Sequence, residues 1–217
     1  AGEKRPAIVY FFGGGWKLGT PIQFYRECAY YASKGMVAVS VDYRIGYLHH
    51  STPFESFEDA KDAICWLRSH ASDKIAVAGG SAGGHLAAAL GTIGSDETVP
   101  AGYRPNLSVL YYPVIDMVSR GYGFPEIKRD FEKISPIHHV SEATPSTLIL
   151  LGTKDPIVSV ETIEAYQDKL LQKGVDCELH LFEGAGHPIF LYRKPLTEEY
   201  YKVRKLTDDF LKRQGFL

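Results

Sequence analysis

The sequence predicts an α/β protein with a doubly wound, mostly parallel sheet of about six strands and helices on both faces. Short continuous apolar runs, typical of buried parallel strands, alternate along the chain with segments of helical periodicity. The 217 residues are 45% hydrophobic and 23% charged, and no apolar run is long enough to span a membrane. One compact soluble domain over residues 1–217 is therefore expected.

Six runs, most of them rich in Val, Ile, Leu or Tyr, are expected to form the strands. They are Ala7–Phe12, Met36–Asp42, Lys74–Gly79, Leu107–Pro113, Thr147–Gly152 and Cys177–Phe182. Apolar stripes and glycine stops predict helices between and after them. These helices lie over Gln23–Lys34, near Glu55–His70, after Ser81, around Ile163–Leu170 and around Tyr200–Phe210. The longest connection, residues 114–146, is rich in glycine and proline and is expected to run over or beside the functional site.

Composition and charge exclude several classes of protein. The 24 basic and 26 acidic residues leave a net charge of −2 without a Lys/Arg block, so neither nucleic acid nor a membrane surface is an expected partner. Cys28, Cys65 and Cys177 lie far apart and outside any ligand spacing, so neither a disulfide framework nor a metal site is expected. No organic cofactor is indicated. The first six residues do not resemble an export signal, which leaves the cytoplasm and secretion after processing both open.

The segment Gly79-Gly80-Ser81-Ala82-Gly83 has the pattern of a nucleophile elbow, a sharp strand-to-helix turn that exposes a serine hydroxyl above the sheet. Small neighbours are needed because the turn is strained and the chain passes close to itself. The pattern alone also arises by chance in glycine-rich chains. The strand before it and the helix after it favour Ser81 as a nucleophile.

Three glycines, Gly13 to Gly15, follow the first strand and precede Trp16. Glycines leave backbone N–H groups uncovered, as an oxyanion hole requires. A flexible turn and a phosphate-binding loop are the alternatives, but the phosphate-loop fingerprint is missing. The N–H groups of Gly14, Gly15 and Ala82 are therefore the expected oxyanion donors.

An acid and a base follow the last two strands. Asp155 comes just past the run Thr147–Gly152, and His187 lies on a glycine-rich loop past Cys177–Phe182. Parallel sheets collect their active residues at these carboxyl ends. The order Ser81, Asp155, His187 predicts a Ser-His-Asp triad, with Asp155 also readable as a turn cap and Glu183 as the reserve acid.

On these motifs the chain resembles the α/β-hydrolase family, in particular small carbohydrate acetyl and feruloyl esterases and the carboxylesterases related to hormone-sensitive lipase. The matching segments span most of the chain in the family's order: Gly13-Gly14-Gly15-Trp16, Asp42-Tyr43-Arg44, Asp59-Ala60-x-x-Ala63-x-x-Trp66-Leu67, Gly79 to Ala87, Gly152-Thr153-x-Asp155 and Gly186-His187. The resemblance implies the fold, the triad and an ester substrate, and it indicates the acyl group only weakly.

The chain departs from the family pattern at two places. Phe12 stands where the family usually has a histidine that braces the oxyanion loop. The family's first two strands normally precede the run Ala7–Phe12, where this chain has only six residues. Either the sheet is a minimal six-stranded version or an N-terminal portion lies outside this sequence.

The expected function is hydrolysis of a short-acyl, acetyl-type ester on a carbohydrate. The sequence has no segment large enough to form an apolar cap over a long acyl chain, which favours the short acyl group. Aromatic side chains are expected in the pocket walls, because sugar rings stack on their flat faces. The candidates are Trp16, Tyr122, Phe124, Phe190 and Tyr192, each of which could equally be core packing. A peptidase or amidase with the same triad, and a binding protein without activity, are the alternatives. The oligomeric state is not indicated.

Overall fold

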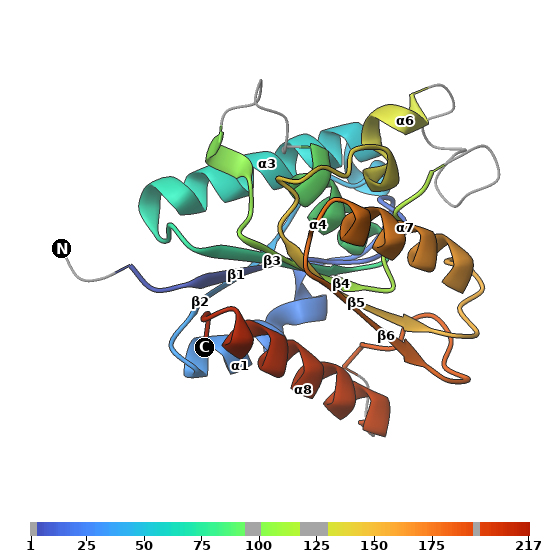
Figure 1. Ribbon diagram of the computed structural model, residues 1–217. Coiled ribbons are helices and arrows are strands. Elements are labelled where there is room, and N and C mark those ends of the chain that lie inside the picture. Colours follow the sequence, from blue (N-terminus) through green and yellow to red (C-terminus); the bar gives the residue numbers. More distant parts are fainter. Residues whose placement is uncertain (1–3, 94–100, 118–129, 193–195) are drawn as a thin grey trace.

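Six parallel strands form the centre of the computed structural model, which describes residues 4–93, 101–117, 130–192 and 196–217 (Figure 1). The strands are β1 (Ala7–Phe11), β2 (Val37–Val41), β3 (Ile75–Gly80), β4 (Leu107–Tyr111), β5 (Ser146–Gly152) and β6 (Cys177–Phe182). Each lies within two residues of its predicted run. The sheet order is β2-β1-β3-β4-β5-β6, with all neighbours parallel, so the predicted doubly wound sheet is confirmed.

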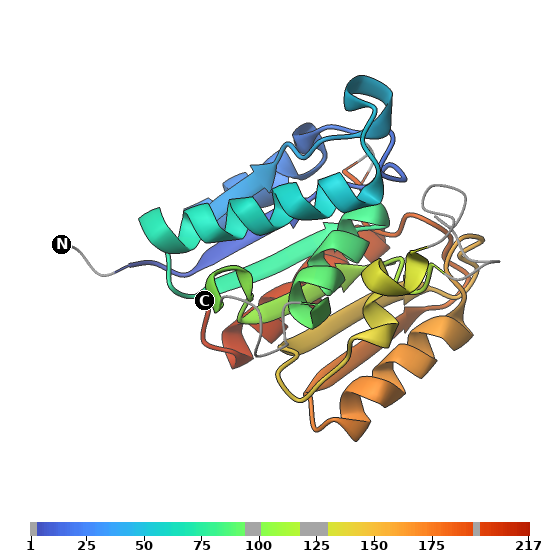
Figure 2. The same ribbon diagram turned by 90° about the horizontal axis from the view of Figure 1, so that it is seen from above.

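Helices cover both faces of the sheet. Helices α3, α4, α6 and α7 lie on one face, and α1 and α8 lie on the other (Figures 1 and 2). The α-helices are α1 (Tyr25–Ser33), α2 (Gly46–His49), α3 (Pro53–His70), α4 (Ala82–Thr92), α6 (Phe131–Ile134), α7 (Val160–Gln172) and α8 (Glu198–Arg213). Short 3₁₀ turns are η1 (Pro21–Phe24), η3 (Ala101–Tyr103) and η4 (Pro136–His138). The helix expected over Gln23–Lys34 therefore begins as the 3₁₀ turn η1.

The interface between α1 and α8 contains a buried ion pair. Glu27 is 3% exposed, and its carboxylate accepts hydrogen bonds from Arg204 Nη2 at 2.7 Å and from the Tyr200 hydroxyl at 2.5 Å. On the same interface, Tyr31 donates to Asp208 at 2.9 Å. Because a buried charge must be paired, these contacts fix how the C-terminal helix packs against the first one.

The strand order reverses at β1, and this reversal determines where a ligand can bind. The chain passes from β1 to β2 on one side and then crosses to β3 on the other side of β1. Ligands of open α/β sheets bind in the crevice that such a reversal opens at the carboxyl ends of the strands. Phe11 pairs with Gly79 at this edge, so the glycine loop after β1 and the serine turn after β3 begin side by side.

Candidate active site

Ser81 occupies a strained turn between β3 and α4. Its backbone has φ 56° and ψ −120°, a conformation that costs a non-glycine residue about 1–3 kcal/mol. A Cβ at Gly79 would lie 2.3 Å from the Gly83 carbonyl oxygen, and a Cβ at Gly83 would lie 2.0 Å from the Phe11 carbonyl oxygen. Glycine at both positions is therefore required for this turn, as the sequence pattern predicted. Hydrogen bonds from Ser81 N to Tyr111 O and from His85 N to Ser81 O hold it in place.

The glycine loop after β1 forms a tight turn beside Ser81. Gly14 has φ 142° and Gly15 has φ 62°, and the Gly14 carbonyl accepts hydrogen bonds from the N–H groups of Lys17 and Leu18. A Cβ at Gly14 would lie 2.0 Å from Leu18 O. Among the hydrogen bonds of the described residues, none is donated by the N–H of Gly14 or Gly15. The N–H of Ala82 lies in the first turn of α4, where no intrahelical acceptor exists.

Two contacts brace this loop in the absence of the family's histidine. Phe12 stacks on Tyr43 with ring centroids 4.1 Å apart, and the Tyr43 hydroxyl donates to Phe12 O at 2.6 Å. The Gly13 N–H donates to Gln23 Oε1 at 2.5 Å. Gln23 was not predicted as a site residue, because nothing in its sequence spacing marks it. The one available signal was Phe12 itself. Its side chain has no polar atom to hydrogen-bond the glycine loop, so another residue must do so.

Trp16 is not a pocket wall, and the prediction that it binds substrate is wrong. It is 1% exposed, and its Nε1–H donates to His85 Nδ1 at 3.2 Å. The indole can only donate, so His85 carries its proton on Nε2 and donates it to Ile134 O at 2.7 Å. Burial lowers the pKa of His85 to about 4, with the bond to Ile134 opposing the shift. A neutral, buried histidine thus links the glycine loop, α4 and α6.

His187 and Asp155 form a close pair at the carboxyl ends of β6 and β5. An ionised carboxylate only accepts, so His187 Nδ1–H donates to Asp155 Oδ2, at 2.7 Å. Asp155 Oδ1 accepts the N–H groups of Ile157 and Val158, at 2.8 and 3.0 Å. Burial opposes ionisation of Asp155, but the hydrogen bonds from His187 and the two backbone groups outweigh it and hold the pKa of this carboxyl below its ordinary value. Tyr112 contacts the imidazole edge to face, with centroids 4.6 Å apart.

These groups surround one cavity of about 270 Å³. It is lined by Gly13, Gly14, Gly15, Gln23, Ser81, Tyr112, Ile157, His187 and Pro188. The predicted nucleophile, base and loop glycines therefore meet in one pocket, with Asp155 buried behind the base. The side chain of Ala82 is fully buried and does not line the pocket, so only its backbone can serve there. Glu183, the reserve acid, is exposed and takes no part in the His187–Asp155 pair.

The aromatic walls of this pocket differ from the predicted ones. Phe190 is 3% exposed and packs between Tyr111 and Tyr200, so the prediction that it binds substrate is wrong. An aromatic residue close in sequence to a catalytic motif can pack in the core as well as line a pocket, and the Phe190 ring packs in the core. Tyr192 lines a neighbouring cavity instead. Tyr122 and Phe124 lie outside the described residues.

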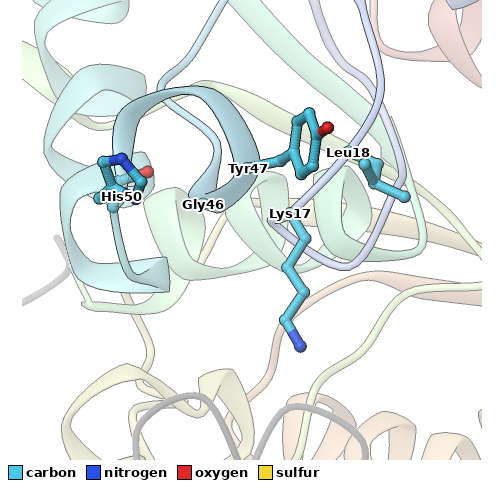
Figure 3. Close-up of a pocket in the computed structure, with 6 residues that line it drawn as sticks. Lys17, Leu18, Gly46, Tyr47 and His50 are labelled. Carbon is cyan, nitrogen blue, oxygen red and sulfur yellow. The ribbon is translucent and has the colours of Figure 1, made fainter.

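A larger hollow of about 550 Å³ lies beside the segment that follows the glycine loop (Figure 3). It is lined by Lys17, Leu18, Gly46, Tyr47, His50 and Ser51. Backbone hydrogen bonds from Gly46 N to Trp16 O and from Tyr47 N to Lys17 O join its two walls. It contains neither Ser81 nor His187 and shares no lining residue with their pocket.

Comparison with known proteins identifies the family. A family model described as alpha/beta hydrolase fold matches residues 8–130, more than half of the chain. The chain belongs to the α/β-hydrolase family. Esterase LipC of Mycobacterium tuberculosis is 30% identical over 85% of this chain and 53% of its own length. An acetylxylan esterase of Xylanibacter ruminicola is 26% identical over 83% of this chain and 40% of its own length. This α/β-hydrolase chain thus spans about half or less of these curated relatives.

Solved structures match over nearly the whole chain. The apo form of Thermogutta terrifontis esterase 2 has a TM-score of 0.91 at 36% identity, covering 99% of this chain and 85% of that one. The propionate-bound form of the same esterase has a TM-score of 0.90 at 37% identity, with the same coverage. Within the described ranges of this α/β-hydrolase, no helix combines the length and hydropathy that a membrane crossing requires.

Proposed function

We propose that this α/β-hydrolase is a serine carboxylesterase that removes short, acetyl-type acyl groups from carbohydrate esters. The observation that carries the proposal is the shared pocket. Ser81 on its strained turn, the glycine loop and the His187–Asp155 pair all converge on the same 270 Å³. A nucleophile, a base oriented by a third group, and free backbone donors are the parts that acyl transfer requires.

In the proposed reaction each of these groups has a role. Ser81 Oγ attacks the ester carbonyl carbon while His187 Nε2 accepts its proton, and Asp155 holds the imidazole in the useful tautomer and stabilises its charge. The carbonyl oxygen becomes an oxyanion that the N–H groups of Gly14, Gly15 and Ala82 bind. The C–O bond then breaks, and His187 gives its proton to the leaving alkoxide. Water, deprotonated by His187, then attacks the acyl carbon. The bond to Ser81 Oγ breaks, Ser81 takes the proton back from His187, and the carboxylic acid leaves.

The size of the pocket supports a short acyl group. A volume of 270 Å³ lies just below the roughly 300–1,000 Å³ of typical ligand sites and suits a few carbon atoms beside the ester bond. Thermogutta terrifontis esterase 2 has been solved with propionate and with butyrate bound. The similar acetylxylan esterase supports a carbohydrate as the alcohol part of the substrate.

An amide substrate is the second candidate. An acylamino-acid-releasing enzyme of Arabidopsis thaliana is 28% identical over 87% of this chain, although over only 28% of its own length. Esters and amides share the acyl-enzyme route, so this distinction is one of rates. Comparison of kcat/KM on 4-nitrophenyl acetate and on 4-nitroacetanilide tests it, and a higher value on the anilide would select the amidase.

The central experiment measures the hydrolysis of 4-nitrophenyl acetate, butyrate and octanoate by wild type and by Ser81→Ala. We expect the rate to be highest on the acetate and to fall by several orders of magnitude in Ser81→Ala. Ser69→Ala is the matched control, because Ser69 is an exposed residue on α3 whose hydroxyl donates to Cys65 O. Equal rates for Ser81→Ala and wild type would refute the proposal, and a rise towards octanoate would refute the short acyl group.

A further inference from the structure

A second cavity adjoins the site and has no role in the proposed reaction. It measures about 310 Å³ and is lined by Ile22, Gln23, Tyr25, Arg26, Leu191 and Tyr192. Gln23 also lines the pocket of Ser81 and His187, so the two cavities meet at this side chain. A substrate whose acyl group fills the first cavity can therefore extend into the second.

The walls of this second cavity are held in position from behind. Phe24, between two wall residues, is 1% exposed and stacks on Tyr10 at 4.8 Å, which anchors the 3₁₀ turn η1 to the core. On the opposite wall, the Tyr192 ring lies 3.7 Å from the guanidinium of Arg26 and contacts the buried Tyr200 edge to face. The cavity is thus formed before ligand arrives, and such preorganisation favours binding because less entropy is lost.

The position of His187 indicates which part of an ester enters this cavity. In ester hydrolysis the leaving alkoxide takes its proton from the imidazole, so the alcohol part must lie on the His187 side. Leu191 and Tyr192 follow His187 by four and five residues and form one wall. None of the residues that line the larger hollow around Tyr47 comes from the segment after His187. The alcohol part therefore extends towards Tyr192.

The side chains around the cavity combine aromatic faces with hydrogen-bond donors. Tyr25 is 56% exposed, and its ring is available to a ligand. Arg26 stacks on Tyr192 by its flat face, which leaves the N–H groups in its plane free to donate. In the part of the chain that the structure describes, Arg26 forms no ion pair. Flat apolar surface beside several donors suits a ring that carries many oxygen acceptors.

We propose that this cavity is the subsite for the alcohol part of the substrate, and that it binds a single sugar ring through Tyr25, Arg26 and Tyr192. This subsite rests on the proposed esterase function. It adds where the alcohol part of the substrate binds and that a polar ring is preferred there. Arg26, held by Tyr192, donates to the oxygens of the sugar, and the exposed ring of Tyr25 provides the stacking surface.

Three acetate esters test the subsite, because they share the acyl group and differ only in the alcohol. They are ethyl acetate, cyclohexyl acetate, which has a ring without acceptors, and a monoacetate of methyl xylopyranoside. For wild type we expect kcat/KM on the sugar ester to exceed that on cyclohexyl acetate by about 10-fold or more, the value of one hydrogen bond to a charged donor. Arg26→Ala should lower this ratio about 10-fold, and Tyr192→Ala should lower it in the same direction.

Tyr47→Ala is the matched control, since Tyr47 is an exposed tyrosine of the other hollow. No turnover of any of the three esters by wild type would overturn the esterase function and the subsite with it. Turnover of all three with equal kcat/KM on the sugar and cyclohexyl esters would overturn the subsite alone. A drop of the ratio in Tyr47→Ala and not in Arg26→Ala would assign the alcohol to the other hollow, and this too would overturn the proposal.

Discussion

Replacement of the buried His85 by glutamine should change how the stability of the protein depends on pH. In the folded state its pKa is lowered from 6.5 to about 4, because the neutral ring is buried between Trp16 and Ile134. Above pH 6.5 the imidazole is neutral in both states, and its contribution to stability is fully present. As the pH falls below 6.5 the unfolded chain binds a proton that the folded chain does not, so stability is lost.

The size of this effect follows from the two pKa values. The linkage relation gives a loss of ~2 kcal/mol at pH 5 and ~3 kcal/mol at pH 4 from this one group. Glutamine does not titrate. His85→Gln should be less stable than wild type at neutral pH by about 1–3 kcal/mol, because the amide cannot occupy the positions of both ring nitrogens and so disturbs the hydrogen bonds with Trp16 and Ile134. By pH 4 wild type has lost ~3 kcal/mol from this group, so the deficit should have vanished and the variant should be as stable as wild type or more stable.

Urea unfolding is followed by fluorescence for wild type and for His85→Gln at about pH 7.5, 5 and 4. The difference between their free energies of unfolding at each pH is the quantity measured. His70→Gln is the control, because His70 lies exposed on α3 and outside the core. A difference between wild type and His85→Gln that stays constant from pH 7.5 to pH 4 would refute a neutral, buried His85.

Three further substitutions probe the site and its support. Gln23→Ala removes the acceptor of the Gly13 N–H, and kcat on 4-nitrophenyl acetate should fall about 10-fold with little change in KM; a change in KM alone would contradict a role through the oxyanion loop. Asp155→Asn should lower kcat by about 10⁴ while the thermal stability changes little. Kinetics measures the first and calorimetry the second. Turnover near the wild-type rate would show that Asp155 is not part of the triad. Glu27→Gln should destabilise the fold by about 1–3 kcal/mol in urea unfolding, because the partly exposed Arg204 loses its charged partner. An unchanged midpoint would show that this pair is not needed.

The fold was predictable because its signals are local. Each strand is a short apolar run, and buried parallel strands must be apolar on both faces, so the ends of these runs predicted the strand boundaries to within two residues. The serine turn was predictable for a related reason. A Cβ added at Gly79 or Gly83 would lie within 2.3 Å of a backbone oxygen, and such a constraint admits few residue types and leaves a recognisable sequence pattern.

The pocket walls were not predictable, because a side chain's surroundings depend on distant parts of the chain. Trp16 looked like a stacking surface, but its hydrogen-bond partner is His85, 69 residues away. Phe190 lies three residues from His187 and is nevertheless buried against Tyr200. Gln23 was missed for the same reason, since its contact with Gly13 exists only after η1 folds back beside the glycine loop.

The most direct test of the account is to locate the activated nucleophile chemically. One similar structure is Thermogutta terrifontis esterase 2 phosphorylated by paraoxon, and a serine made reactive by His187 should be phosphorylated by the same reagent. After treatment with paraoxon, peptide mass spectrometry should find the phosphoryl group on Ser81 in wild type and a far slower reaction in His187→Ala. Modification of another residue, or equal labelling of Ser81 in both proteins, would contradict a Ser81–His187–Asp155 triad.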